Sequence, residues 1–390
     1  DPYLGTIDSF RDLCHDFNKS GIKLVLDGVF SHTGSDSIYF NRYGRYPGIG
    51  AYQSKESAYY PWFNFIDYPN TYASWWGFDN LPELIKENED YTNYVCSQED
   101  GVLKFWQDLG AGGWRLDVAD ELPDVFIDRL RESIKATDPE AIIIGEVWED
   151  ATNKFSYGGR RRYLLGQQLD SVMNYPWRTA IIDLLKGQDT KLFKNRIIDL
   201  ISNYPQPALD TLMNLLSTHD TARITTCLAL DVDSFKHEDK LGYSLPEGLY
   251  KKALELEKIA SFIQFTLPGV PSLYYGDENG MEGFSDPYNR CCFIEEDRNQ
   301  DIYDHYKALT TFRAKYKDSF KTGFEFGFAR ENLICYYRND IACLVNLGDK
   351  PVLVEEILGG KKVFGNKDAY PTNYGLVVGP RSYTAIHLDK

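Results

Sequence analysis

Short apolar runs alternate with longer segments of helical periodicity from the start of the chain to about residue 317. An apolar run of roughly four to eight residues predicts a buried strand, and apolar residues at helical spacing predict a helix with one buried face. The expected strands are 22–30, 113–119, 141–148, 168–174, 211–218 and 271–275. The expected helices are 6–20, about 90–110, 123–136, 177–202 with a break, 250–266 and 301–316. The alternation predicts an α/β fold whose parallel strands are linked by crossover helices.

Two regions depart from this alternation. Residues 31–89 are rich in Tyr, Trp, Gly, Asn and Pro and are too long for an ordinary loop, so we expect an inserted subdomain there. From residue 318 onward, short alternating segments bounded by turn residues predict a small antiparallel β-sandwich. Its expected strands are 333–338, 341–346, 352–356, 374–378 and 382–388. The expected domains are a main α/β domain formed by 1–30 and 90–317, the insertion at 31–89 and a C-terminal domain at 318–390.

Four of the six expected strands end with charged or imidazole side chains, directly after the apolar run. They are Asp27 with His32, Arg115 with Asp117, Glu146, and His219 with Asp220. In a TIM (β/α)8 barrel, residues at the carboxyl ends of the strands meet at one face, where the active sites of this fold lie. The sequence therefore predicts a TIM (β/α)8-type barrel that gathers these side chains into one pocket.

Three of these side chains, Asp117, Glu146 and Asp220, are carboxylic acids, and Arg115 offsets part of their charge. Three acidic groups around one pocket suit the splitting of a glycosidic bond through a transition state that resembles an oxocarbenium ion. No redox or phosphate chemistry is suggested by the sequence. The pattern favours a glycosidase.

Charge and composition narrow the class of ligand. The formal net charge of −16 at pH 7 disfavours nucleic acid and anionic membrane surfaces as partners, because like charges repel. The sequence has no run of about 18 apolar residues and no basic segment followed by an apolar leader, so neither a membrane span nor a signal peptide is expected. A neutral ligand fits better, and aromatic residues, 15% of the chain, can stack on sugars.

The seven cysteines are scattered along the chain and lack paired C-x-x-C spacing. This distribution disfavours a disulfide framework or a zinc site, so we expect reduced thiols in a cytoplasmic protein. A bridge between Cys335 and Cys343 is the alternative that the sequence leaves open.

Four segments, in order, resemble the signature regions of the α-amylase superfamily. They are D-G-V-F-S-H at 27–32, G-W-R-L-D-V-A-D-E at 113–121, G-E-V-W at 145–148 and L-L-S-T-H-D at 215–220. Two auxiliary segments are also similar, L-P-E-L at 81–84 and G-V-P-S-L-Y-Y-G-D-E at 269–278. The resemblance covers residues 1 to about 280, and it implies a retaining glycosidase on a TIM barrel.

The resemblance assigns the chemistry to two residues. Asp117 would attack the anomeric carbon, and Glu146 would protonate the leaving oxygen and then activate water. Arg115, on the same face of its strand as Asp117, would keep that carboxyl ionised. Asp27 would have a structural role and orient Arg115.

The same resemblance assigns further residues to substrate binding. Asp220, the third candidate catalytic residue, would bind hydroxyls of the distorted sugar ring, and as a nearby like charge it would help to keep Glu146 protonated. The remaining candidate substrate-binding residues are His32, Arg115, His219, Trp148 and Glu121. Trp148 can either stack on the leaving-group sugar or pack within the fold. Asp120 stands where the neopullulanase-like subgroup usually has Asn, and it would alter the leaving-group subsite.

Three features resemble the neopullulanase and cyclomaltodextrinase branch: the V-A-x-E ending, L-P-E-L, and Trp75-Trp76-Gly77. L-P-E-L departs from the branch's usual P-K-L-N. The branch implies cleavage of α-1,4-glucosidic bonds in maltodextrins, cyclodextrins or pullulan, and a possible homodimer. An exo-acting α-glucosidase, a 1,6-debranching enzyme and a non-catalytic sugar-binding homologue are the alternatives.

Two other features depart from the family pattern. Family members have two further barrel strands before the one expected at 22–30, so we expect strands 3 to 8 here, with the first two missing. Six strands cannot close an eight-stranded barrel, and unpaired edges favour association. Calcium-dependent members usually carry Asn where this chain has Ser31, so no cofactor is expected and calcium is an unsupported alternative.

Overall fold

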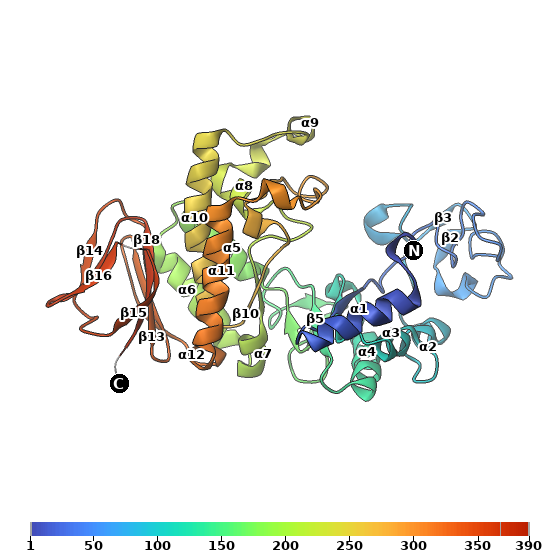
Figure 1. Cartoon of the computed structure of the whole chain (residues 1–390). Coiled ribbons are helices and arrows are strands. Elements are labelled where there is room, and N and C mark those ends of the chain that lie inside the picture. Colours follow the sequence, from blue (N-terminus) through green and yellow to red (C-terminus); the bar gives the residue numbers. More distant parts are fainter. Residues whose placement is uncertain (1, 367, 389–390) are drawn as a thin grey trace. The chain divides into compact units, whose positions relative to one another are not determined.

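The computed structural model describes residues 2–366 and 368–388 (Figure 1). The chain forms two compact units, Asp1–Met173 and Asn174–Lys390. Each unit has its own sheets and helices, and each is described separately below. No helix in the described part of the chain is long and apolar enough to span a bilayer.

The first unit is built on a four-stranded parallel sheet. In sheet order its strands are β1 (Val25–Gly28), β4 (Gly113–Leu116), β5 (Ile142–Gly145) and β8 (Ser171–Val172). Its helices are α1 (Ile7–Lys19), α2 (Glu89–Cys96), α3 (Val102–Asp108) and α4 (Asp124–Thr137) (Figure 1). Its short elements include η1 (Pro2–Leu4) and the hairpin of β6 (Phe155–Ser156) and β7 (Gly159–Arg160). Parallel pairing puts the carboxyl ends of β1, β4 and β5 at the same edge of the sheet.

Helix α4 shows how the sequence periodicity builds this unit. Phe126, Ile127, Leu130 and Ile134 recur at helical spacing and are at most 1% exposed. The helix therefore has one apolar face that is fully removed from water, while Asp124 in its first turn suits the positive end of the helix dipole. On β4, a Cβ at Gly113 would lie only 2.4 Å from the carbonyl oxygen of Ile142, so only glycine allows this close pairing of strands.

The segment 31–89 is held together largely by aromatic side chains. It contains η2 (Tyr60–Trp62), β2 (Phe65–Asp67), β3 (Thr71–Tyr72) and η3 (Trp75–Gly77). Phe40 is fully buried, and its ring lies 4.8 Å from that of Tyr72 and 4.9 Å from that of Phe63, centroid to centroid. Edge-to-face ring packing of this kind supplies a small core where regular structure is scarce.

The second unit begins with helices around a two-stranded parallel sheet of β9 (Met213–Leu215) and β10 (Val270–Ser272). Its helices are α5 (Tyr175–Leu185), α6 (Thr190–Asn203), α7 (Gln206–Thr211), α8 (Ile224–Ala229), α9 (His237–Lys240), α10 (Glu247–Thr266), α11 (Gln300–Lys315) and α12 (Lys317–Lys321) (Figure 1). Its 3-10 helices are η5 (Val232–Ser234), η6 (Asp277–Asn279) and η7 (Glu295–Asp297). The C-terminal half of α10 is almost entirely buried.

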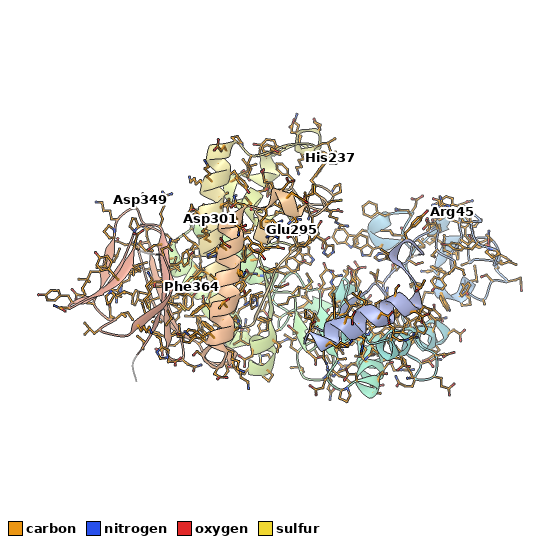
Figure 2. All side chains as sticks on the ribbon, viewed as in Figure 1. Arg45, His237, Glu295, Asp301, Asp349 and Phe364 are labelled. Carbon is orange, nitrogen blue, oxygen red and sulfur yellow. The ribbon has the colours of Figure 1, made fainter. Side chains whose placement is uncertain are left out.

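The C-terminal strands form two antiparallel sheets. One has the order β11 (Glu325–Arg330), β12 (Leu333–Arg338), β13 (Ile341–Asn346), β18 (Ser382–His387) and β15 (Lys361–Gly365), and the other β14 (Val352–Val354), β17 (Gly375–Val378) and β16 (Ala369–Thr372). Leu344, Val354 and Leu376, drawn from both sheets, share one buried core. Phe364 of β15, labelled in Figure 2, stacks on Phe312 of α11 at 4.9 Å.

The observed elements agree with most of the expected ones. All six expected strands of the α/β region are present, although each is shorter than expected, and the five expected C-terminal strands are present too. The expectation of one helix over about 90–110 is wrong, because α2 ends at Cys96 and α3 begins at Val102. The break is tight at Gly101, where a Cβ would lie 2.5 Å from backbone atoms of Ser97. All seven cysteines are free thiols, including Cys335 and Cys343.

Candidate active site

The carboxyl ends of three neighbouring strands in the first unit gather four of the predicted site residues. Asp27 lies on β1 directly opposite Arg115 on β4, and Asp117 follows β4 immediately. Glu146 follows β5, which pairs with β4. Parallel, in-register strands therefore bring together side chains that are up to 119 positions apart in the sequence, from Asp27 to Glu146.

Arg115 binds all three carboxylates. Its Nη1 lies 2.7 Å from Asp27 Oδ1 and 2.7 Å from Asp117 Oδ1. Its Nη2 lies 2.6 Å from Glu146 Oε2. The guanidinium side chain is 12% exposed, so these charge-assisted bonds are partly shielded from water and fix the three acids relative to one another.

Both oxygens of Glu146 are oriented by donors. Oε2 also accepts a hydrogen bond from the backbone N–H of Val118 at 2.9 Å, and Oε1 accepts one from Trp148 Nε1 at 2.8 Å. Val118 has φ of 39°, in the left-handed region that a β-branched residue rarely adopts. Strain of this kind is concentrated at functional sites, and here it aims an amide at Glu146.

The electrostatics of Asp117 differ from the sequence-based expectation. Burial raises the pKa of Asp117 to about 6, and although Arg115 opposes this shift, Glu146 and Asp27 add to it. The expectation that Arg115 keeps Asp117 ionised is therefore incomplete, because desolvation outweighs the guanidinium. Burial also opposes the charge on Arg115, but the three carboxylates together raise the pKa of that guanidinium above its ordinary value.

His32 is the imidazole that the first unit places near this edge. Its Nδ1 is hydrogen-bonded to Ser31 Oγ at 2.8 Å, and its ring lies 5.2 Å from that of Trp75. Burial, followed by the nearby Lys86, lowers the pKa of His32, so its ring is neutral at neutral pH and available for hydrogen bonding.

The V-A-D-E segment places its two acids differently. Glu121 accepts a hydrogen bond from Trp76 Nε1 at 2.8 Å. Asp120 instead accepts one from Tyr163 OH at 2.7 Å and pairs with Lys154 at 2.8 Å. Asp120 is thus engaged in contacts within the fold, and Trp148 is 46% exposed.

His219 and Asp220 lie in the second unit, in a turn that follows β9. Asn289 Nδ2 donates to the carbonyl oxygens of Thr218 at 2.9 Å and Thr221 at 2.8 Å. Arg290 donates to the His219 carbonyl at 3.0 Å and lies 3.5 Å from Asp220 Oδ1. The turn that presents the two predicted residues is therefore held on both sides by the loop containing Asn289 and Arg290.

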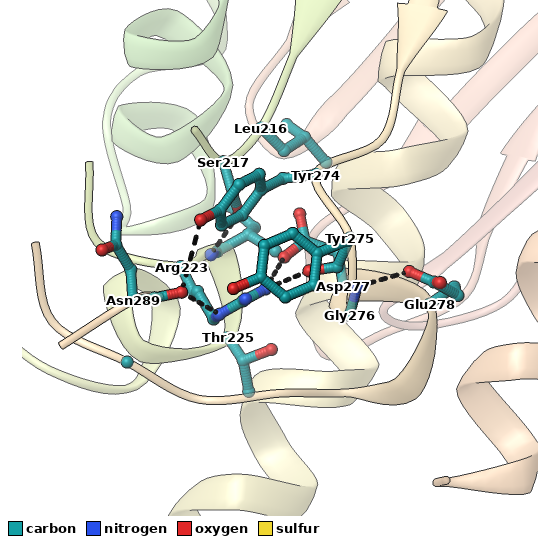
Figure 3. Close-up of polar contacts among 12 residues, drawn as sticks. Leu216, Ser217, Arg223, Thr225, Tyr274, Tyr275, Gly276, Asp277, Glu278 and Asn289 are labelled. Atoms are coloured by element: carbon teal, nitrogen blue, oxygen red, sulfur yellow. Dashed lines mark hydrogen bonds and ion pairs between the residues drawn. The ribbon is translucent and has the colours of Figure 1, made fainter. Parts of the chain in front are cut away.

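Arg223 ties this turn to its surroundings (Figure 3). It is fully buried and donates to the carbonyl oxygens of Tyr275 at 2.7 Å and Asn289 at 3.1 Å, and to Asp277 Oδ1 at 3.2 Å. Its guanidinium also lies 4.6 Å from the centroid of the Tyr274 ring. One cation thereby joins three loops that are distant in sequence.

A second buried acid, Glu257 of α10, adjoins this network. It accepts hydrogen bonds from Thr225 Oγ1 at 2.6 Å and Tyr306 OH at 3.1 Å. Burial raises the pKa of Glu257, and the proximity of Asp277 raises it further; burial likewise raises the pKa of Asp277. Burial therefore favours the protonated form of each acid, and Arg223 offsets the charge of only one carboxylate.

Sequence reasoning missed Arg223, Glu257 and Asn289. The signal for Arg223 was its position three residues after Asp220, and the signal for Glu257 was an acid within the apolar stretch of a helix. Among residues 2–366 and 368–388, no group of three or more His, Cys, Asp and Glu side chains is arranged to hold a metal ion.

Residues 1–332 match the family model described as alpha amylase, catalytic domain. The chain belongs to the α-amylase family. Membership gives it the TIM barrel catalytic domain and the C-terminal β-domain of that family. The two missing barrel strands, the boundaries of the inserted subdomain and the domain limits stay predictions.

Curated relatives in the α-amylase family are longer than this chain. An amylopullulanase of Thermoanaerobacterium thermosulfurigenes is 34% identical over 98% of this chain and 20% of its own length. A cyclomaltodextrinase of Thermoanaerobacter pseudethanolicus is 31% identical over 98% of this chain and 62% of its own length. The chain thus spans less than two thirds of these relatives.

Solved structures of the α-amylase family share the fold. The native debranching enzyme of Nostoc punctiforme has a TM-score of 0.81 and 27% identity, covering 99% of this chain and 80% of that one. A cyclomaltodextrinase has a TM-score of 0.79 and 26% identity, covering 99% of this chain and 64% of that one.

Proposed function

We propose that the chain is the catalytic part of a retaining glycoside hydrolase that cleaves α-1,4-glucosidic bonds in maltodextrins, cyclodextrins or pullulan. The observation that carries the proposal is the single guanidinium of Arg115, which binds Asp117 at 2.7 Å and Glu146 at 2.6 Å. Two carboxylates on neighbouring nitrogens of one guanidinium favour the short separation of a retaining pair, about 5–5.5 Å, over the wider gap of an inverting pair.

In the proposed first step, Asp117 attacks the anomeric carbon while Glu146 gives its proton to the departing oxygen. The glycosidic bond breaks, and a covalent glycosyl ester forms on Asp117. In the second step, Glu146 takes a proton from water, whose oxygen attacks the same carbon and releases Asp117. Two inversions give net retention, and no cofactor is needed.

The reactive state requires one proton, placed on Glu146 and not on Asp117. Asp117 holds its proton more tightly than an ordinary aspartic acid, because it is buried beside two other acids. Arg115 contacts both groups, and its positive charge favours the ionised form of Asp117. A sugar oxygen that accepts from Glu146 favours the arrangement with Asp117 ionised.

The remaining site residues are assigned by the family motifs. Asp220 and His219 are proposed to bind hydroxyls of the distorted ring, and His32 to bind the same ring. Trp148 is proposed to face the leaving-group sugar, and Glu121 to bind an adjoining unit. Arg115 is proposed to hold the catalytic pair, and Asp27 to orient Arg115.

A second candidate is cleavage of α-1,6 bonds. It is favoured by the relatives named amylopullulanase and by the structural neighbour named as a debranching enzyme. Pullulan separates the two candidates, because cleavage at α-1,6 bonds yields maltotriose, whereas cleavage at α-1,4 bonds yields panose or isopanose. Exo-action would instead release one small sugar from chain ends and leave β-cyclodextrin intact.

The test is product analysis on maltoheptaose, β-cyclodextrin and pullulan, with the Asp117→Asn variant as the inactive control. The proposal expects opening of the cyclodextrin, panose-type products from pullulan, and initial products that keep the α-anomeric configuration by NMR. Initial β-anomers, or a folded wild-type chain that binds α-glucans without cleaving them, would contradict it. The latter result would favour the non-catalytic sugar-binding protein.

The pH dependence follows from the environment of Asp117. Its pKa is raised from the ordinary 3.8 to about 6, and the nucleophile works only when ionised. Activity should therefore be present above about pH 6 and should fall about tenfold per pH unit below it.

Arg115→Met should move this acidic limb of the pH–activity profile to higher pH, because the cation that favours ionisation of Asp117 is lost. Initial rates on an aryl maltoside between about pH 4 and pH 9 measure kcat/KM; a limb near the ordinary pKa of about 4 would contradict the assignment.

A further inference from the structure

Trp76 is a large aromatic side chain exposed on the first unit. It lies in η3, and its residue exposure is 77%. One side of its indole is covered by Trp75, whose ring lies 5.4 Å away at an interplanar angle of 27°. A tryptophan stacked on one side and this widely exposed presents a flat apolar surface to solvent, which core packing does not explain.

A hydrogen bond fixes the plane of this indole. Trp76 Nε1 donates to Glu121 Oε1 at 2.8 Å, and Glu121 lies in η4 (Ala119–Glu121), just after Asp117. Tyr157 OH in turn donates to the Glu121 carbonyl oxygen at 2.7 Å. The exposed ring is therefore anchored to the loop that follows the proposed nucleophile.

The backbone around this anchor is strained at three places. Trp76, Val118 and Tyr157 have φ of 50°, 39° and 51°, in the left-handed region that favours glycine. Each conformation is energetically costly and persists only where surrounding contacts enforce it. The strained backbone holds the Trp76 ring in water and does not bury it, which indicates a role in ligand binding.

The surroundings select a neutral polyhydroxylated ligand. Burial raises the pKa of Tyr157 to about 12, and the nearby carboxylates of Glu83, Glu87 and Glu121 contribute to the shift. Lys86 pairs with Glu83 and Arg161 lies by the Tyr157 ring, so the three carboxylates are partly offset, but together they still disfavour an anionic ligand. Carboxylate oxygens accept hydrogen bonds from hydroxyls, and an indole face packs against the C–H face of a pyranose ring.

We propose that Trp76, held by Glu121, is a stacking platform for a glucose unit adjoining the one that is cleaved, and that it favours binding of long α-glucan chains over short ones. The inference rests on the proposed function. It predicts that the platform contributes to binding of a chain long enough to reach it, and contributes little to the chemistry on a short substrate.

The experiment measures affinity and rates separately. Affinities for maltoheptaose and maltose are measured by calorimetry in the Asp117→Asn background, and kcat and KM are measured with Asp117 intact. Trp76→Ala should weaken maltoheptaose binding about tenfold, the equivalent of one lost ring contact, with little change for maltose. Trp76→Phe should weaken maltoheptaose binding less than Trp76→Ala does. Glu121→Ala should weaken it more than Glu121→Gln, since glutamine keeps an oxygen for the indole N–H. Phe105→Ala, which removes an exposed aromatic ring from α3, is the matched control and should leave binding unchanged.

The outcomes separate this inference from the proposed function. A raised KM with kcat within about twofold for Trp76→Ala, at an unchanged unfolding temperature, supports the platform. If hydrolysis depends on Asp117 but Trp76→Ala binds maltoheptaose as well as its parent does, the platform is refuted and the enzyme assignment stands. If the wild-type chain neither binds nor cleaves α-glucans, both are refuted.

Discussion

Asp117→Asn is expected to reduce kcat on maltoheptaose by a factor on the order of 10⁴ or more, the largest effect that we predict. An amide is a far weaker nucleophile than a carboxylate, so the covalent intermediate cannot form at a useful rate. The substitution keeps the shape of the side chain and an oxygen that can accept from Arg115 at the 2.7 Å contact. The fold should therefore be retained, as circular dichroism and thermal unfolding will show.

Glu146→Gln separates the two catalytic roles. It should lower kcat on maltoheptaose by about 10²–10⁴, because the proton donor is lost. With α-maltosyl fluoride, whose leaving group needs no proton, glycosylation should proceed in this variant and added azide should accelerate turnover. Asp117→Asn should stay inactive on both substrates. Equal losses for the two variants on the fluoride would contradict the assignment of roles.

Arg223→Met is expected to have the largest effect on stability, lowering the free energy of unfolding by about 3–5 kcal/mol. The substitution leaves the fully buried carboxylate of Asp277 without its cation, and it removes donors from the carbonyl oxygens of Tyr275 and Asn289. Urea denaturation followed by fluorescence measures the change. Activity should fall as well, since Asn289 holds the turn that carries Asp220.

Two variants control this prediction. Arg11→Met removes the cation of an exposed ion pair with Asp8 and should change stability by less than about 1 kcal/mol. The double variant Arg223→Met with Asp277→Leu removes both buried charges and should recover part of the loss. A change below about 1 kcal/mol for Arg223→Met alone would show that Arg223 does not hold these loops together.

Strand periodicity was sufficient to predict the part of the candidate site that lies at the ends of β4 and β5. An apolar run ending in Arg115 and Asp117, with another ending before Glu146, predicts parallel strands with charged ends, and the structure pairs those strands in register. The family motifs add the roles, which the contacts of Arg115 support. Burial changed the expected protonation of Asp117, because desolvation depends on three-dimensional surroundings that a sequence pattern does not contain.

The contacts that sequence reasoning missed join residues distant along the chain. Arg223 meets Asp277 across 54 positions, and Trp76 meets Glu121 across 45. Neither pair has a local periodicity, so each side chain alone reads as an ordinary surface or loop residue. The break at Gly101 was missed for another reason: the helical spacing of apolar residues continues across it, and only the close backbone contact with Ser97 shows why two helices form.

Asp117 is the proposed nucleophile of a retaining glycosidase, and trapping the covalent intermediate tests this role. The chain is incubated with a fluorinated maltosyl fluoride that forms the glycosyl ester quickly and hydrolyses it slowly, and the labelled peptide is identified by mass spectrometry. We expect one fluorinated maltosyl group on the peptide that contains Asp117, and no label in Asp117→Asn. A label on Glu146, or turnover of the fluoride by the wild-type chain with no carboxylate labelled, would contradict it.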